Sequence, residues 1–313
     1  MTRVRDSAGV VINGQRYERP DGESVLDALR AAGIDLPAIC HDERIAPSGA
    51  CRLCLVRVAG VAKPVTACTI RIRDGMAIDT TIPALEESRR SFIEMLGRRL
   101  SAEDVRRCPD KPFHRELRAR GLTGIPAAEP PDETLRDDSH PYIAVDMARC
   151  IDCYRCVRIC AELQGQFVWH LRGRGEDTRL RPDGPSLLDS SCVACGACAD
   201  TCPTGAIEDR SVALLGEPSA WTRTTCAYCG VGCELDAGTR DGRLVAMRPV
   251  LDAPVNKGHL CVKGRYAFDY VSAADRVTEP MLRVNGAWTT VTWPDAIGFV
   301  AGRFRALIES VRP

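Results

Sequence analysis

The sequence is short of several features that would otherwise suggest a function. Aromatic residues make up only 5% of the 313 residues, so no single large aromatic core is expected. Lys plus Arg and Asp plus Glu are both 42, and the resulting net charge of zero gives no reason to expect nucleic acid or an anionic membrane as a partner. No run of about 18 apolar residues occurs, so no transmembrane helix is expected.

The chain also lacks a recognisable export signal. Its first residues, MTRVRDSAGVVING, contain no apolar segment of the kind found in secretory signals. The stretch SRRSFI at residues 88–93 resembles a twin-arginine signal, but it is internal and is followed by EMLGRR instead of apolar residues. We interpret it as the exposed face of a helix. The expected location is therefore the cytoplasm.

Cysteine is the residue that the chain has in excess. In a reducing compartment, 17 cysteines indicate metal ligands rather than disulfides, because disulfide frameworks belong mainly to small secreted domains. Sixteen of them fall into groups with recognisable spacing, and Cys108 stands alone.

Turn and periodicity signals predict an α+β multidomain fold. The first segment has hairpin signals at Asn13-Gly14 and Asp74-Gly75 and a helix between Ser24 and Gly33, which is the order of a β-grasp domain. A helical spacer with a Pro- and acid-rich linker follows, then an internal repeat that forms a two-cluster ferredoxin domain. The last segment has turn signals at Asp241-Gly242 and Asn285-Gly286 and a helix from about Pro294. The predicted boundaries are 1–80, 81–141, 142–215 and 220–313.

The strongest motif is a repeat with the spacing C-x2-C-x2-C-x3-C. Three cysteines on a tight loop can reach three corners of one cubane, and the fourth lies far enough along the backbone to ligate the other cluster. Paired zinc sites fit this register poorly, because zinc normally takes two ligands from each of two knuckles. The first predicted [4Fe-4S] set is Cys150, Cys153, Cys156 and Cys202. The second is Cys192, Cys195, Cys198 and Cys160.

Four more cysteines near the N-terminus have the spacing C-x10-C-x2-C-x13-C. This pattern keeps the close pair and the distant fourth cysteine of plant-type [2Fe-2S] proteins, with a longer first gap. Gly49 and Ala50 suit a loop that wraps a cluster, and His41 is expected to be solvated or hydrogen-bonded and not a ligand. A structural zinc is the alternative. The predicted [2Fe-2S] ligands are Cys40, Cys51, Cys54 and Cys68.

The last group has the spacing C-x2-C-x3-C-x27-C. Spacing alone fits zinc or [4Fe-4S], and its place after two ferredoxin-type runs favours the cluster. Lys263, two residues after the last cysteine, is either a surface lysine or a contact for an anionic cofactor. The predicted ligands are Cys226, Cys229, Cys233 and Cys261.

Several such sites in series indicate electron transfer, because isolated clusters of these types do no bond chemistry. Their order, with TTCAYCGVGC at 224–233 and GHLCVKGR at 258–265, resembles the start of the alpha (catalytic) subunit of NAD-dependent molybdenum or tungsten formate dehydrogenases. These enzymes are molybdopterin oxidoreductases with a complex I-like N-terminus. The resemblance covers essentially the whole chain.

That resemblance implies conversion of formate to CO2 at a molybdenum or tungsten bis(pyranopterin guanine dinucleotide). It also implies a partner subunit that carries FMN, NAD and its own iron–sulfur clusters, and it places Lys263 between the last cluster and a pterin. The family's metal is held by a later Cys or selenocysteine, and this chain has no Cys or His after Cys261. No catalytic residue is therefore assigned. We expect either a fragment or one half of a split subunit completed by a second chain.

Relatives of this family carry a further [4Fe-4S] motif, H-x3-C-x2-C-x5-C, in the spacer. With Cys108 as its second cysteine, the other three positions fall on Ser101, Val105 and His114. Ser and Val are poor or impossible iron ligands. The sequence therefore predicts that these four residues are non-ligands and that this cluster is absent.

The predicted function is the electron-transfer portion of a cytoplasmic formate dehydrogenase or CO2 reductase. The alternative is a non-catalytic iron–sulfur carrier or adaptor subunit of a hydrogenase or complex I-like assembly. Two complete ferredoxin runs argue against a complex I-like subunit, and a hydrogenase diaphorase subunit would stop near residue 215. Neither nucleic acid nor a membrane is expected as a partner.

Overall fold

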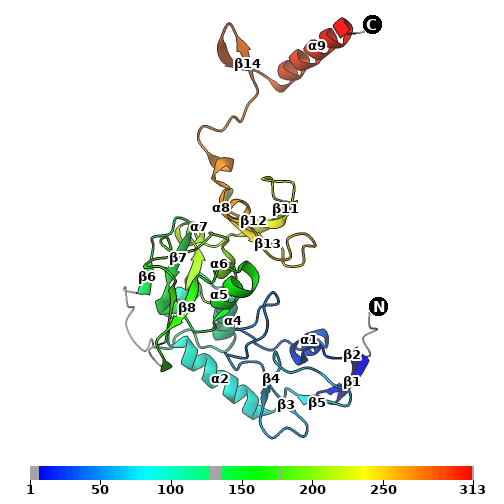
Figure 1. Cartoon of the computed structure of the whole chain (residues 1–313), viewed down its shortest axis with the longest axis vertical. Coiled ribbons are helices and arrows are strands. Elements are labelled where there is room, and N and C mark those ends of the chain that lie inside the picture. The colour runs from blue at the N-terminus through cyan, green and yellow to red at the C-terminus, as the bar shows by residue number, and fades with distance from the viewer. Residues whose placement is uncertain (1–6, 127–134, 176–177, 312–313) are drawn as a thin grey trace. The chain divides into compact units, whose positions relative to one another are not determined.

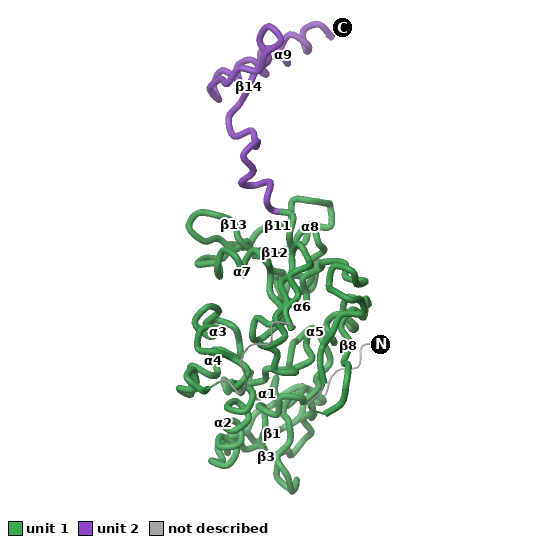
Figure 2. The backbone as a smooth tube through the Cα atoms, turned by 90° about the vertical axis from the view of Figure 1, so that its left-hand side faces the viewer, with its two compact units in different colours: residues 1–267 green, residues 268–313 purple. Residues whose placement is uncertain are grey.

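The computed structural model describes residues 7–126, 135–175 and 178–311. The chain divides into two compact units, residues 1–267 and residues 268–313, which are described separately (Figure 2). Figure 1 follows the elements in chain order. Helices and strands are mixed throughout, as the sequence predicts for an α+β protein. The finer division into four domains stays a prediction.

A five-stranded sheet with one helix forms the N-terminal part. Asn13 and Gly14 both have positive φ, 50° and 82°, so they form the tight turn predicted between β1 and β2. Ser24 caps helix α1 by accepting the Asp27 amide hydrogen. The strand order is β2-β1-β5-β3-β4, with β1 and β5 parallel. The bounds are β1 Ser7–Ile12, β2 Gln15–Pro20, α1 Val25–Ala31, β3 Leu55–Val58, β4 Val65–Thr66 and β5 Ala77–Asp79.

The second predicted hairpin, at Asp74-Gly75, is wrong. A turn is present, but β5 after it pairs with β1 and β3 and not with a strand that ends at this turn. Asp74 accepts the Gly9 amide at 2.8 Å, and the Gly75 amide donates to the Gly9 carbonyl at 2.8 Å. The polar groups of the turn therefore bond to β1, which decides the pairing.

Three helices form the spacer, as predicted: α2 Pro83–Gly97, α3 Ala102–Arg107 and α4 Pro112–Ala119. Residues Leu85, Phe92, Ile93 and Leu96 recur at helical spacing and form an apolar stripe on α2, and Leu85 and Ile93 of this stripe are buried. Ile93 joins Phe113 and Leu117 in one apolar cluster, so the stripe is packing. Part of the predicted linker, residues 127–134, lies outside the described residues.

The cysteine repeat folds into two matching halves. In each half a short helix begins after the second close cysteine and contains the third. Positive φ angles occur at Asp152 and Tyr154 before the first helix and at Ala194 and Gly196 before the second. Because the left-handed residues fall at the same positions in both copies, the two loops bend in the same way, as expected from their shared cysteine spacing. The elements are β6 Arg136–Asp137, β7 Ile143–Asp146, α5 Arg155–Ile159, β8 Trp169–Arg172, β9 Arg179–Pro182, α6 Ala197–Thr201, β10 Ile207–Asp209 and α7 Arg210–Leu215.

The last part of the first unit is a three-stranded antiparallel sheet followed by one short helix. Its strands are β11 Ala220–Thr225, β12 Glu234–Arg240 and β13 Arg243–Pro249, and its helix is α8 Val262–Tyr266. The predicted turn at Asp241-Gly242 joins β12 to β13.

The second unit consists of a hairpin, β14 Met281–Val284 and β15 Ala287–Thr290, and helix α9 Trp293–Val311. The predicted Asn285-Gly286 turn joins the two strands, and the helix starts one residue before the predicted Pro294. Within the described parts of the whole chain, no helix combines the length and apolar character needed to cross a membrane.

Candidate metal centres

The four N-terminal cysteines lie as two close pairs. The sulfurs of Cys54 and Cys68 are 3.5 Å apart, and the Cys51 amide donates to the Cys40 sulfur at 3.4 Å. Hydrogen bonding within each pair lowers the pKa of the Cys40 thiol and of the Cys54 thiol. A [2Fe-2S] centre needs two thiolates on each of two irons. The paired arrangement fits that demand, although the ligand assignment itself stays a prediction.

The loop that carries Cys51 and Cys54 is fixed by its backbone. Gly49 has φ of 66°, and a Cβ there would lie 3.0 Å from Thr69 and 3.1 Å from Thr66, so glycine is required. Leu53, between the two cysteines, is fully buried. This close packing explains why small residues precede the pair.

The interpretation of the SRRSFI stretch as an exposed face is wrong for its first arginine. Arg89 lies in α2 but is only 3% exposed. Its Nε and Nη2 donate to the carbonyls of Leu53 and Leu55 at 3.2 and 2.6 Å, and Glu86 accepts from Nη1. Arg89 therefore ties the spacer to the cysteine loop. The sequence contains a signal for the burial of Arg89, because this residue lies four residues after Leu85 and four before Ile93, on the buried stripe.

The two halves of the repeat surround two separate cavities. One is lined by three cysteines of the first copy and the last cysteine of the second: Cys150, Cys153, Cys156 and Cys202. The other is lined by three cysteines of the second copy and the last cysteine of the first: Cys192, Cys195, Cys198 and Cys160. The structure thus brings together both predicted sets, crossed as the spacing requires.

Burial changes the acidity of several cysteines of the repeat. Desolvation raises the pKa of the Cys156 and Cys198 thiols well above the ordinary value, and it raises that of Cys153 to about 12. Such thiols are protonated at neutral pH, and metal ligation requires thiolates. Assembly of a centre in either cavity therefore releases protons.

The last cysteine group lies between β11, β12 and α8. The Cys226 amide donates to the Cys233 carbonyl at 2.8 Å. A Cβ on Gly264 would lie 3.4 Å from the Cys226 sulfur, so the first turn of α8 runs directly beside it. Cys261 precedes α8 and is exposed, and Lys263 in its first turn is exposed too. The structure therefore brings the helix that follows the fourth cysteine beside the first cysteine of the group.

Zinc and a multi-iron centre place different demands on the geometry of the thiols. In the described part of the chain, no three His, Cys, Asp or Glu side chains are placed to hold one metal ion. Zinc–sulfur bonds of about 2.3 Å would require thiols to converge on one point. Four cysteines round each of two cavities fit a multi-iron centre better.

The lone Cys108 lies in a packed region of the spacer. Ser101 caps α3 and bonds to Asp104, and Val105 is buried in the apolar cluster of Phe113. Cys108 is 1% exposed, and burial raises the pKa of its thiol to about 11. The Nδ1 of His114 lies 2.6 Å from the Cys108 carbonyl. These contacts fill the positions of the spacer motif with caps and packing, and the assignment of the four residues as non-ligands stays a prediction.

Sixteen cysteines in four groups, eight of them round paired cavities, define an iron–sulfur electron-transfer protein. Three families match in order. Residues 6–83 match the 2Fe-2S iron-sulfur cluster binding domain, and residues 140–208 match the ferredoxin-like domain of NADH-quinone oxidoreductase subunit 3. Residues 219–273 match the molybdopterin oxidoreductase Fe4S4 domain. Residues 6–83, 140–208 and 219–273 are thus similar, in this order, to iron–sulfur domains of NADH-quinone oxidoreductases and molybdopterin oxidoreductases.

Similar proteins are oxidoreductase subunits. An NADH-quinone oxidoreductase subunit of Rhizobium meliloti is 34% identical over 94% of this chain, and the alpha subunit of the NADPH-Fe(3+) oxidoreductase of Geobacter sulfurreducens is 30% identical over 96%. A candidate formate dehydrogenase of Staphylococcus aureus is 25% identical over 97%. This chain spans 35% of the length of each. A chain of a NAD+-reducing [NiFe]-hydrogenase shares 28% identity with a TM-score of 0.55, over 65% of this chain and 87% of that one.

Proposed function

We propose that this chain is the electron-relay portion of an NADH- or NADPH-linked oxidoreductase. It would carry single electrons between a partner subunit with flavin and NAD and a molybdopterin-type site outside residues 1–313. The observation that carries the proposal is the crossed set of eight cysteines round two cavities. Bound iron–sulfur clusters would supply one-electron redox centres there.

The protein's own contribution is to position and insulate these thiols. Cys40 of the first group and Cys153 of the second lie in the same apolar cluster. Tyr266, next to the last cysteine group, packs in the cluster that contains Cys198. All four groups are therefore linked by packed segments within the first unit, as a relay needs.

Formate is the finer part of the proposal. It rests on the resemblance of the sequence and on the Staphylococcus relative, which is 25% identical over 97% of this chain. The Rhizobium and Geobacter relatives align over 308 and 311 positions at higher identity. These two relatives support a complex I-like or adaptor function as the second candidate. The two complete ferredoxin runs, in contrast, argue against a complex I-like subunit.

Helix α9 presents an exposed apolar face. Trp293, Ile297, Phe304 and Val311 are all more than 60% exposed and recur along one helix face. An apolar stripe of this size needs a cover. We propose that the remainder of a molybdopterin domain, on this polypeptide or on a second one, covers this face. Independently of α9, we assign Lys263 to the pterin side of the last cluster.

Anaerobic purification with iron analysis and EPR tests the proposal. One [2Fe-2S] and three [4Fe-4S] centres require about 14 iron atoms per chain. Cys202→Ser should remove the signal of the first cubane despite its place in the second repeat, and Cys108→Ala serves as the matched control with no loss. Zinc in place of iron would contradict the proposal.

Substrate is tested on the complex isolated with its native partners. Formate, NADH and NADPH are added separately, and reduction of the centres is followed by EPR. Reduction by formate supports the finer proposal. Reduction by a nicotinamide nucleotide alone favours the second candidate.

A further inference from the structure

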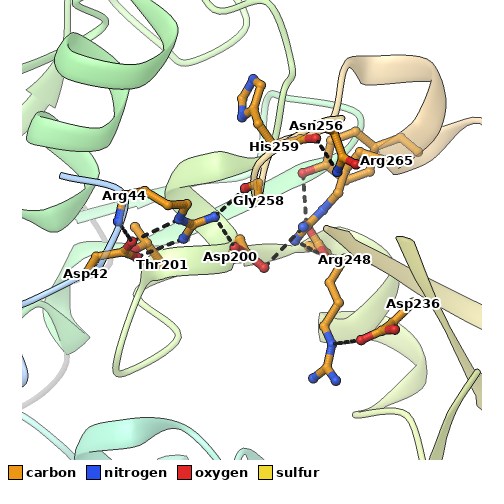
Figure 3. Close-up of polar contacts among 12 residues, drawn as sticks. Asp42, Arg44, Asp200, Thr201, Asp236, Arg248, Asn256, Gly258, His259 and Arg265 are labelled. Carbon is orange, nitrogen blue, oxygen red and sulfur yellow. Dashed lines mark hydrogen bonds and ion pairs between the residues drawn. The ribbon is translucent and has the colours of Figure 1, made fainter. Parts of the chain in front are cut away.

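A buried chain of ion pairs joins segments that flank the four cysteine groups, and Figure 3 shows its Asp42, Arg44, Asp200 and Arg265. Asp42 lies two residues after Cys40, and Asp200 lies between Cys198 and Cys202. Arg44 joins these two carboxylates, with side-chain exposures of 8% for Arg44, 5% for Asp42 and 15% for Asp200. Their positions beside the cysteines raise the question of what they hold in place.

Arg44 uses its whole guanidinium in these contacts. Nε and Nη2 donate to the two carboxylate oxygens of Asp42 at 2.9 and 2.8 Å. Nη1 donates to Asp200 at 2.8 Å and to the carbonyl of Gly258 at 2.8 Å. Gly258 lies three residues before Cys261. One side chain thus bonds to the N-terminal part, the ferredoxin repeat and the last cysteine segment.

Two further arginines extend the chain of pairs. Arg155, between Cys153 and Cys156, donates to Asp42 at 2.9 Å and to Thr201 at 2.7 Å. Arg265, four residues after Cys261, donates to Asp200 at 3.3 Å and to Asp209 at 2.8 Å. Three guanidinium groups thus face three carboxylates, and the network is neutral.

A neutral buried network of this kind adds little net stability, because desolvation offsets most of the attraction between its charges. What it does provide is fixed geometry, since Arg binds carboxylates in a planar fork that Lys cannot reproduce. Next to the network, Ile45 packs against Ile159 and Ala197. The segment Arg44–Ile45 is therefore a docking strip with one polar and one apolar contact.

We propose that Arg44 is a positioning residue for electron transfer. It holds the segment after Cys40, the segment between Cys198 and Cys202, and the segment before Cys261 at fixed separations. Electron transfer between centres falls steeply with distance, so these separations decide the rate. The inference rests on the proposed function, because it concerns the same four cysteine groups.

The test uses Arg44→Gln and Arg44→Lys in the full chain. Lys keeps the charge but cannot reach Asp42, Asp200 and Gly258 together. Arg19→Gln is the matched control, because Arg19 makes a two-bond contact with Glu23 inside the N-terminal part only. Docking of the strip is measured by amide hydrogen exchange at Ile45 and at the next residue, Ala46, whose amide bonds to Glu162. The relaxation of the [2Fe-2S] EPR signal by reduced neighbours reports distance.

In Arg44→Gln we expect exchange at residues 45 and 46 to rise by about 100-fold, since two buried carboxylates lose a partner. We expect a smaller rise, about tenfold, in Arg44→Lys. Both variants should keep their iron content while the relaxation effect weakens. Arg19→Gln should match the wild type in both measurements.

The inference would be overturned if an iron-replete Arg44→Lys variant showed the same amide exchange and the same EPR relaxation as the wild type. If Arg44→Gln fails to fold, the Arg44→Lys variant alone decides the test. Lower thermal stability with unchanged relaxation would also overturn the inference, because it would show a merely structural role. Absence of iron from the wild-type chain is a separate result. It would defeat the proposed function, whereas exchange at residue 46 would still report docking.

Discussion

Replacing Arg89 by Met should detach the spacer helix from the loop that carries Cys51 and Cys54. The substitution keeps an unbranched apolar stem in a buried position and removes two hydrogen bonds to the carbonyls of Leu53 and Leu55. Hydrogen bonds from a charged donor contribute about 1.5–3 kcal/mol each, so roughly 3 kcal/mol is lost at the low end. The Glu86 pair adds little, because that carboxylate is 55% exposed.

The assay follows thermal loss of the visible absorbance of the iron–sulfur protein beside calorimetry. A loss of about 3 kcal/mol corresponds to roughly 6–12 °C in a domain of this size class. Arg90→Met is the control on the same helix, since Arg90 is exposed and makes one long bond to the Arg120 carbonyl. It should change stability by no more than about 0.5 kcal/mol. Equal melting of the two variants would refute the reasoning.

Two further predictions concern the spacer. Cys108→Ala should leave the iron content at about 14 atoms per chain and lower stability by about 1 kcal/mol, because it removes only a buried sulfur; loss of about four iron atoms would show that a cluster does bind there. Burial lowers the pKa of His114 below its ordinary 6.5, so the unfolded chain takes up a proton first and stability falls as pH drops below about 6.5. His114→Asn should lessen that slope, by up to about 1.4 kcal/mol per pH unit, when unfolding is compared at pH 7 and pH 5.5; an unchanged slope would contradict this origin.

Local signals predicted the parts of the fold that depend on few neighbouring residues. The turns at Asn13-Gly14 and Asn285-Gly286 need only positive φ at two adjacent residues, and the structure confirms both. Asp74-Gly75 is the same kind of turn dipeptide, but the strands on its two sides do not pair with each other. Its outcome depends on Gly9, 65 residues away, which no local pattern contains.

The cysteine groups could be predicted for a different reason. Ligand spacing is a covalent constraint on how far a loop can reach round one centre, so it survives in the sequence whatever the tertiary contacts. The residues that hold the groups together leave no such mark. Arg44 and Asp200 are 156 residues apart, and each alone looks like an ordinary surface charge. Their burial is visible only once the folded segments meet.

The packing of the spacer bears on how the N-terminal cysteine group and the repeat are connected. If no cluster forms near Cys108, the N-terminal group and the repeat must communicate without it. Cys40 and Cys153 lie in the same apolar cluster as Val105 and Phe113, which occupy the positions round the degenerate motif. The apolar packing therefore holds the two outer groups together directly, whether or not the spacer binds a cluster. A spacer cluster would be a side branch of this route and not a link in it.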